Sequence, residues 1–372
     1  MKNNANPLTQ WFHTASGKLT LTILRRTLLC LVTLILLVAI GLAVVCNQIF
    51  NGPSPYARNI LTMSMLESSG MKWFPGLFIG AEMVDKIQQD VQTPVMDDVS
   101  SSDQIVIRPP STGSSEWKDH PDGIRIEYIS GDTYNAYVML IRDPSAVYMA
   151  TSTEKFSMSI PGTRITDEIV TQGALAAINA GAFYDNGTSD PVVGSVPQGL
   201  VVADGEVVWT SGSAPEQGFV GFNKDNVLIV AKSMTASKAK ELNIRDGCCF
   251  GPVLVMNGQP NMEAYNSNSG WNPRTAIGQR ADGVVIFICV DGRQAGSIGG
   301  SYKDVIDIMI EYGAVNACNL DGGSSTVMMY KDTVGKMGEK DQIHMINNYS
   351  VLQKEPRRMP TFFMVRPSSE VE

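Results

Sequence analysis

The stretch Asn316-Ala-Cys-Asn-Leu-Asp321-Gly-Gly-Ser-Ser-Thr326 joins a short apolar run to one acid, two glycines and three hydroxyl residues. This pattern is typical of a strand that ends in a functional loop. The acid supplies charge, and glycine lets a ligand approach the main chain closely. A single Asp-Gly is more often an ordinary turn. The stretch therefore predicts a strand end, and a site is predicted only with support from elsewhere.

Two upstream segments carry the same kind of signal. Pro273-Arg-Thr-Ala-Ile-Gly278 contains a β-like run, and the apolar residues 284–290 lead into Asp291-Gly-Arg293. Binding and catalytic residues are concentrated on loops that a rigid scaffold positions. We therefore expect the acids and guanidiniums of the three segments to meet at one pocket where the β-layer ends.

Four segments that follow one another in order resemble the motifs of the phosphodiester glycosidase family. They are Ile178-Asn179-Ala-Gly-Ala-Phe183-Tyr184, Pro273 to Gly278, Asp291-Gly-Arg293 and Leu320-Asp321-Gly-Gly-Ser324. The resemblance covers about residues 123–366 and is greatest to membrane-anchored bacterial relatives. Two motifs depart from the family pattern. Asn-Ala-Gly-Ala-Phe replaces an Asn-Gly-Gly-Phe type motif, and Asp-Gly-Gly-Ser-Ser lacks a third glycine.

The resemblance implies a hydrolase that releases a sugar from a sugar-1-phosphodiester. Cleavage at the anomeric carbon passes through an oxocarbenium-like state that two carboxylates normally manage. The departing phosphomonoester has a second pKa of about 6 and needs little help from a general acid. We expect Asp321 and Asp291 to be the catalytic carboxylates. Arg274 and Arg293 are expected to clamp the phosphate, because a guanidinium fork matches two phosphate oxygens.

The other motif residues are expected to bind the substrate. Backbone N–H groups and hydroxyls are offered by Gly322, Gly323, Ser324 and Ser325. Asn179 is expected to hydrogen-bond the sugar hydroxyls or amide, and Phe183 or Tyr184 to pack against the sugar ring. Structural roles are the alternatives, with Asp321 as a turn residue and Arg274 as a salt-bridge partner.

Composition excludes several other classes of function. The net charge is −8 and no basic stripe is present, which argues against a nucleic-acid partner. The three histidines are widely separated, so a histidine-based metal cluster is not expected. No cofactor is required. A Ca²⁺ or Mg²⁺ ion held by aspartates and main-chain oxygens is left open, although no spaced acidic loop demands one.

Two further features leave alternatives open. Cys289 and Cys318 each lie near a predicted strand end and are either a disulfide between neighbouring strands or buried thiols. The adjacent Cys248 and Cys249 lack the spacing of a metal motif. The glycine-rich residues 296–301 lead into a predicted helix and are either an anion-binding loop or a plain loop.

Residues 27–46 carry no charge and are long enough to cross a bilayer as a helix. A cleaved signal peptide is the alternative, but its apolar run is usually about 7–15 residues. Lys18, Arg25 and Arg26 precede the run. This bias predicts a single-pass protein of the cell membrane with a cytoplasmic N-terminus and an extracytoplasmic C-terminal domain.

The sequence divides into a cytoplasmic segment (1–26), an anchor (27–46), a juxtamembrane stem and linker (47–122) and one domain (123–372). Residues 56–90 favour short helices, either at the membrane surface or packed on the domain, and 91–122 favour an exposed linker. Hairpins are predicted at 124–141 and at 200–209, around Asp204-Gly205. Helices are predicted from Thr166, at 237–242 and after an N-cap at Ser301. The predicted class is α+β, with one mixed sheet and a few packed helices.

These features predict a membrane-anchored extracytoplasmic glycosidase that cleaves the C1–O bond of sugar-1-phosphodiesters in envelope polymers or glycans. Its partners would be the sugar-phosphate diester or glycan and the membrane. One alternative is a non-catalytic glycan-binding module that assists exopolysaccharide or cell-wall assembly. The other is a phosphodiesterase that cuts the P–O bond.

Overall fold

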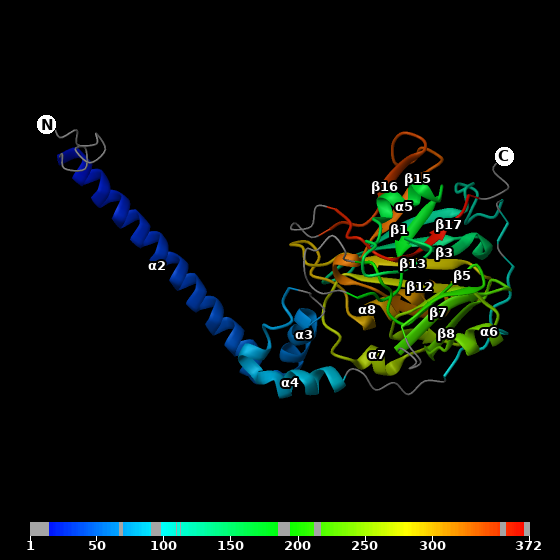
Figure 1. The fold of residues 1–372 in the computed structure, drawn as a ribbon, viewed down its shortest axis with the longest axis horizontal. Helices are drawn as coiled ribbons and strands as arrows, with labels where there is room; N and C mark the ends of the chain where they lie inside the picture. The colour runs from blue at the N-terminus through cyan, green and yellow to red at the C-terminus, as the bar shows by residue number, and fades with distance from the viewer. Residues whose placement is uncertain are drawn as a thin grey trace.

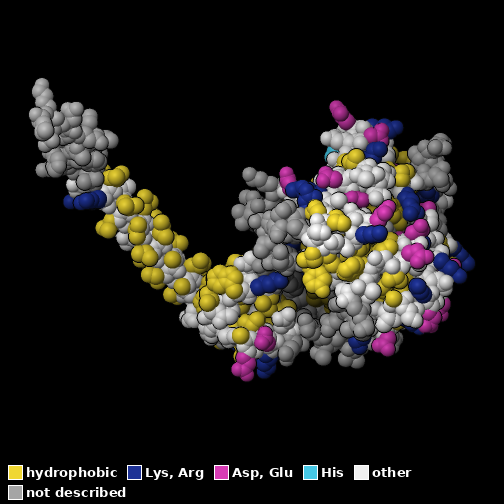
Figure 2. All heavy atoms as spheres, viewed as in Figure 1, with side chains coloured by type: hydrophobic (Ala, Val, Ile, Leu, Met, Phe, Trp, Pro, Cys, Tyr) yellow, Lys and Arg dark blue, Asp and Glu magenta, His cyan; other side chains and the backbone are white. Residues whose placement is uncertain are grey.

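The computed structural model describes residues 15–66, 70–90, 98–108, 110–111, 113–184, 194–211, 217–349 and 355–367. A long helix, α2 (Ala15–Asn51), projects from a β-rich body, as Figure 1 shows. Within the stretch Thr22–Asn51, an 18-residue window has a mean hydropathy of 3.2, and none of that window is buried. By length and composition this helix can cross a membrane, and Figure 2 shows apolar side chains along it.

Two further helices connect α2 to the body. The helix α3 spans Pro55–Leu66, and α4 spans Gly76–Asp90 with a break at Gly80. The ring of Phe50, at the end of α2, is fully buried and stacks on Phe78 of α4 at 5.0 Å between centroids. The helix α3 contacts the body directly, because the Trp271 N–H donates to Ser64 Oγ at 2.9 Å. This segment therefore packs on the domain, which was one of the two predicted alternatives.

The described strands form three sheets in which every strand pairing is antiparallel. The seven-stranded sheet has the order β1 (Ile124–Ser130), β2 (Asn135–Ile141), β13 (Val285–Val290), β12 (Arg274–Arg280), β14 (Ala314–Leu320), β10 (Val253–Met256) and β11 (Gln259–Pro260). The β4 sheet has the order β16 (Gln342–Met345), β15 (Met328–Asp332), β4 (Ala176–Asn179), β17 (Thr361–Val365) and β3 (Val147–Thr151). The β9 sheet has the order β6 (Glu206–Thr210), β5 (Leu200–Ala203), β9 (Ile244–Cys249), β7 (Gln217–Asn223) and β8 (Leu228–Ser233).

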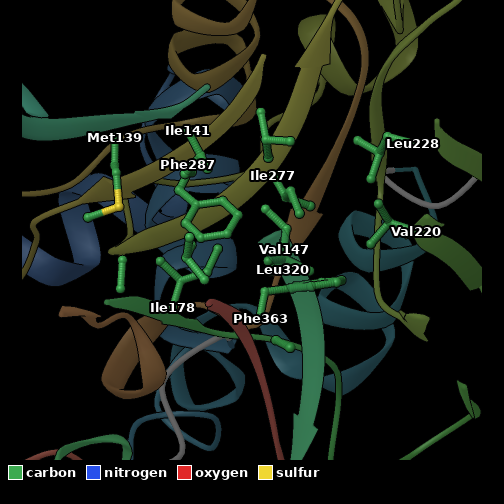
Figure 3. Packing of buried hydrophobic residues seen from close by; sticks show 14 of the residues in the cluster. Met139, Ile141, Val147, Ile178, Val220, Leu228, Ile277, Phe287, Leu320 and Phe363 are labelled. Atoms are coloured by element: carbon green, nitrogen blue, oxygen red, sulfur yellow. The ribbon is translucent and has the colours of Figure 1, made fainter. Parts of the chain in front are cut away.

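The main core lies between these three sheets. Phe287 and Ile277 reach it from the seven-stranded sheet, Ile178 and Phe363 from the β4 sheet, and Val220 from the β9 sheet (Figure 3). Successive residues of a strand point to opposite faces, so the alternate residues of β2 pack in a second cluster with α8 (Tyr302–Glu311). Both faces are thus covered, which explains why these strands read as continuous apolar runs.

The three predicted helices form within one residue of their predicted starts, and α7 (Met262–Asn266) was not predicted. The body also holds α5 (Ile165–Thr171) and α6 (Ala236–Glu241). At α8 the Ser301 N–H donates to Asp304 Oδ2 at 2.7 Å and the Asp304 N–H donates to Ser301 Oγ at 3.3 Å. This reciprocal pair is the predicted capping box, and Gly313 follows the helix with a φ of 78°.

The α+β class and both predicted hairpins are confirmed, while the strands form three antiparallel sheets where one mixed sheet was predicted. The predicted exposed linker also differs over its described part. Trp117 is 0 % exposed and Ile105 is 4 % exposed, so these residues belong to the packed body. Its residues 91–97, 109 and 112 lie outside the described residues.

Of the two alternatives for Cys289 and Cys318, a disulfide or buried thiols, the disulfide does not form. Strand β12 lies between the strands that carry them, because Thr275 pairs with Cys289 on one side and Ile277 pairs with Cys318 on the other. Both thiols are buried and free, which is the alternative that the sequence left open.

Candidate active site

The three glycine-rich segments meet at one end of the seven-stranded sheet. Strand β12 begins where its two antiparallel neighbours end, since Arg274 pairs with Val290 and Thr275 pairs with Leu320. Asp291 and Asp321 therefore follow β13 and β14 on either side of the start of β12. The antiparallel register brings together segments that are far apart in the sequence.

Glycines allow these segments to pack around Pro273. The Gly323 N–H donates to the Pro273 carbonyl at 2.8 Å. A Cβ atom at Gly322 would lie 2.7 Å from that same carbonyl oxygen, and one at Gly292 would lie 2.7 Å from the Pro273 ring. Any larger residue at either position would separate the segments, so these glycines are required for close backbone approach.

A small pocket of about 60 Å³ opens at this point. It is lined by Pro273, Gly292, Arg293, Gly323, Ser324, Thr326, Asn348 and Tyr349. Asn348 and Tyr349 follow β16, so the pocket lies at the junction of the seven-stranded sheet and the β4 sheet.

Arg293 supplies one positive charge to the pocket wall. Its backbone is in the left-handed region with a φ of 58°, and its Nη2 donates to Asn272 Oδ1 at 3.2 Å. A Cβ atom at Gly323 would lie 3.2 Å from Nη2, so the guanidinium rests directly on the glycine turn. The predicted placement of Arg293 at the site agrees with this geometry.

Arg357 supplies a second positive charge that the sequence did not indicate. Its Nη1 donates to Ser324 Oγ at 3.2 Å, and its guanidinium lies 4.8 Å from the centre of the Phe183 ring. Phe183 is only 7 % exposed, and its ring packs against the guanidinium of Arg357. The sequence predicted that this ring, or that of Tyr184, packs against a sugar. Two guanidiniums thus contact adjacent residues of one turn.

Asp321 is held through its backbone. Its N–H donates to the Ala180 carbonyl at 3.0 Å, and its carbonyl accepts from Asn179 Nδ2 at 2.5 Å. The residue itself is partly exposed. Its position is therefore fixed without burying the whole residue.

Asn179 lies behind the site. It is 0 % exposed, and its Oδ1 accepts from Thr275 Oγ1 at 2.8 Å and from the Val327 N–H at 3.1 Å. These contacts join β4, β12 and the chain on both sides of the glycine turn. The geometry favours a positioning role for Asn179 over the direct sugar contact that the sequence predicted.

Asp291 differs from Asp321 in its burial. It is 1 % exposed, with Oδ1 accepting from the Asn348 N–H at 2.8 Å and Oδ2 accepting from Asn348 Nδ2 at 2.9 Å. Burial raises the pKa of this carboxyl, while the hydrogen bonds from Asn348 and Asn347 oppose the rise. Asp291 therefore holds Asn348 in the pocket wall, where the sequence predicted a second catalytic carboxylate.

Arg274 is not among the residues that line the pocket. It is 2 % exposed, its Nη2 donates to the Ser269 carbonyl at 2.7 Å, and its Nε donates to the Gly300 carbonyl at 3.2 Å. The guanidinium also lies 4.3 Å from the ring centre of Tyr302. These contacts brace two loops beside the site, and they favour a structural role over the predicted phosphate clamp.

Comparison with known proteins assigns the family. The family model described as phosphodiester glycosidase (NAGPA) matches residues 172–366, which is just over half of the chain. The chain belongs to the phosphodiester glycosidase family. The matched region includes Arg293, Arg357, Asp291 and Asp321.

Individual relatives are distant. The chain is 27 % identical over 189 residues to the SPbeta prophage-derived uncharacterized protein YomE of Bacillus subtilis (strain 168), covering 50 % of this chain and 27 % of that protein. Among solved structures, it resembles the zebrafish N-acetylglucosamine-1-phosphodiester alpha-N-acetylglucosaminidase catalytic domain auto-inhibited by its pro-peptide. That match has 17 % identity and a TM-score of 0.47, and covers 75 % of this chain and 98 % of that chain. A Burkholderia pseudomallei K96243 putative exported protein gives a TM-score of 0.42 at 16 % identity, covering 63 % of this chain and 74 % of that one.

Several polar groups of this phosphodiester glycosidase are buried at the pocket without a hydrogen-bond partner among the described residues. Thr326 Oγ1 and Tyr349 Oη belong to lining residues, and Asn272 Nδ2 and Ser325 Oγ belong to residues that adjoin the lining. An unpaired buried polar group costs about 1–3 kcal/mol. These four groups are therefore a local cost to stability beside the pocket.

The loop 296–301 does not offer the anion site that was one reading of the sequence. The first N–H groups of α8 are already paired, since the Tyr302 N–H donates to Ser269 Oγ at 2.9 Å and the Asp304 carboxylate caps Ser301. An acid at this position repels an anion. Within the described part of the chain, no group of three His, Cys, Asp or Glu side chains is placed to hold a metal ion.

Proposed function

We propose that this phosphodiester glycosidase hydrolyses sugar-1-phosphodiesters at the C1–O bond, with the phosphate bound at the pocket beside Gly323 and Ser324. The observation that carries the proposal is the pair of guanidiniums, Arg293 against Gly323 and Arg357 on Ser324, next to Asp321. Guanidiniums are suited to phosphate because their planar N–H groups match its oxygens in pairs.

The chemistry requires little acid catalysis. Water adds to C1, the C1–O bond breaks with its electron pair on the phosphate oxygen, and the water loses a proton. The phosphomonoester that leaves has a second pKa of about 6, so we assign its stabilisation to the two arginines. This accounts for a site in which only one of the two predicted carboxylates is partly exposed.

Asp321 is the carboxylate that we assign to C1. It either accepts the proton of the attacking water or forms a glycosyl intermediate that water then hydrolyses. Inversion of the anomeric configuration in the released sugar identifies the first route, and retention identifies the second. Asp291 acts through Asn348 as a positioning residue.

We further propose that α2 anchors the chain in the cell membrane and that the domain lies on the extracytoplasmic side. The apolar stretch Thr22–Asn51 supports the anchor, and Lys18, Arg25 and Arg26 before the span support the orientation. The substrate is then a diester within envelope polymers or surface glycans.

The test uses the full-length chain in detergent micelles with a panel of α-sugar-1-phosphate diesters and UDP-sugars in oxygen-18 water. We expect free sugar that carries the label, because C1–O cleavage transfers the water oxygen to the sugar. Label in the phosphate would establish the phosphodiesterase alternative. Saturable binding of glycan without any turnover would establish the non-catalytic alternative.

A further inference from the structure

Residues 70–79, which include the start of α4, close over the end of α2. Their N–H groups bond to carbonyls three or four residues earlier, so the segment is a run of helical turns. Its rings Phe74 and Phe78 pack on Phe50 of α2, with ring centroids 6.3 Å and 5.0 Å away. Figure 1 shows the start of α4 beside the end of α2. We call residues 70–79 the apolar turn.

The apolar turn also presents large apolar side chains outward. Trp73 is 63 % exposed, Leu77 is 68 % exposed and Met71 is 38 % exposed. Trp73 and Leu77 are four residues apart, so they share one side of the helical turns. The indole N–H of Trp73 donates to the Gly70 carbonyl at 3.2 Å. The ring can therefore leave water without an unpaired donor.

Charge distinguishes the apolar turn from the rest of α4. Lys72 is its single charged residue, and this side chain is exposed. At Gly80 the backbone leaves the helix with a φ of 75°, and the next ten residues include three acids. One cation among apolar side chains suits a layer of negatively charged lipid headgroups, whereas a group of acids does not.

The contact with α2 sets the depth of the apolar turn. The uncharged run 27–46 crosses a hydrocarbon core of about 30 Å as a helix, at about 1.5 Å per residue. Phe50 follows this run by four residues, which is about 6 Å beyond the core. The headgroup layer is about 5–8 Å thick on each side, and tryptophan is enriched in it. Because the apolar turn packs on Phe50, Trp73 lies near this layer.

We propose that Met71, Trp73 and Leu77 insert into the headgroup layer of the membrane that α2 spans, with Lys72 beside the lipid phosphates. The apolar turn is then a second membrane contact next to the anchor. This proposal rests on the proposed anchoring of α2, which sets the depth at which the turn meets lipid. The occupant is lipid because the exposed surface continues that of α2, whose apolar side chains reach its junction with α4 in Figure 2.

The test measures thiol reactivity in nanodiscs of phosphatidylcholine and phosphatidylglycerol that hold one full-length chain each. Leu77→Cys and Met262→Cys are treated with a water-soluble maleimide, and the wild type corrects for its own thiols. Met262 on α7 is the matched control, because it is 52 % exposed against 68 % for Leu77. We expect Leu77→Cys to react at least about tenfold more slowly, since lipid excludes the reagent and disfavours the reactive thiolate.

Equal rates, or a faster reaction at Leu77→Cys, would overturn the proposal, because exposure in the protein alone would then decide the reactivity. A slow reaction in crowded vesicles but not in single-chain nanodiscs would also overturn it, because a second copy of the chain would then cover the turn.

A second measurement uses tryptophan fluorescence. Lipids brominated close to the headgroup should quench the part of the signal that is lost in Trp73→Phe. They should not quench the part that is lost in Trp209→Phe, since Trp209 is a half-buried residue of β6 that packs on Phe156 at 5.8 Å between ring centroids. An unquenched Trp73 signal would overturn the proposal.

Extraction with alkaline carbonate separates this proposal from the anchor. If vesicles retain the chain and Trp73 is not quenched, the anchor stands and the contact of the apolar turn fails. If carbonate removes the chain but Trp73 is quenched before extraction, the anchor fails and the turn stands as a peripheral lipid contact.

Discussion

The ends of strands β13 and β14 carry similar sequences and have different structures. Each strand leads into an Asp-Gly pair beside the start of β12. At β13 the side chain of Asp291 is buried and is used to hold Asn348, whereas at β14 it is the backbone of Asp321 that is held and the residue stays partly exposed. Two similar sequences at neighbouring strand ends thus place one acid in the interior and leave the other partly exposed.

The strongest test of this difference is the pair Asp321→Asn and Asp291→Asn. We expect Asp321→Asn to lower kcat by about 10³-fold, because it removes the group assigned to C1. Asp291→Asn should lower kcat by less than about tenfold, because it loosens Asn348 without removing a reacting group. The measurement is the initial rate of sugar release from a sugar-1-phosphate diester. Similar losses in two folded variants would show that both strand ends are catalytic.

The second prediction concerns the adjacent arginines 357 and 358. Arg357→Ala should lower kcat/KM by about 10- to 100-fold, because a charge-assisted contact to the phosphate is lost. Arg358→Ala is the matched control, since its Nη1 donates to the Gly162 carbonyl at 3.0 Å, and it should stay within about threefold of wild type. If the two variants lose activity equally, Arg357 does not contact the substrate.

The third prediction addresses how the backbone of Asp321 is positioned. Asn179→Ala should lower the free energy of unfolding by about 2–4 kcal/mol, because it leaves several buried groups without partners. Thr275→Val removes only one of these hydrogen bonds and should cost about 1 kcal/mol. Both values are measured by urea denaturation. A loss of activity with unchanged stability in Asn179→Ala would instead support the direct sugar contact.

The smallest effect is in the pH dependence of stability. The pKa of Asp291 is raised in the folded state, so the folded chain binds more protons than the unfolded chain between the unfolded value of about 3.9 and the raised value. The contribution of Asp291 to stability therefore falls as the pH rises through this window. We expect the stability of Asp291→Asn relative to wild type to increase as the pH rises from 4 to 7. The measurement is the difference in Tm between the two proteins at each pH. A constant difference in Tm would contradict the raised pKa.

The sequence predicted correctly those elements that depend only on residues close together in the chain. The Asp204-Gly205 turn has a positive φ at both residues, as its hairpin requires, and the capping box at Ser301 forms as the sequence indicates. The sequence also predicted that Asp291 and Asp321 lie where the β-layer ends. Both follow strands that end at the same edge of one sheet, because β13 and β14 are each antiparallel to β12.

The remainder depends on contacts between sheets, which no local pattern encodes. Asn348 lines the pocket and Arg357 contacts the lining residue Ser324, and neither stands in a distinctive motif. Arg274 stands in a motif, but loop carbonyls and the ring of Tyr302 surround its guanidinium, which the sequence could not show. Because the sequence before residue 123 is rich in polar residues, it did not indicate that Ile105 and Trp117 are buried in the body.

The contact of α3 with the domain bears on where the proposed reaction takes place. Gly270 has a φ of 72° and leaves no room for a side chain beside Ser64, and Arg274 braces the same loop. The helix α3 is thus fixed against the domain at Ser64. If α2 anchors the chain in a membrane as proposed, this contact would hold the pocket at a set height and tilt above the lipid. With the proposed anchor in the membrane, the pocket would then meet only ligands at that height.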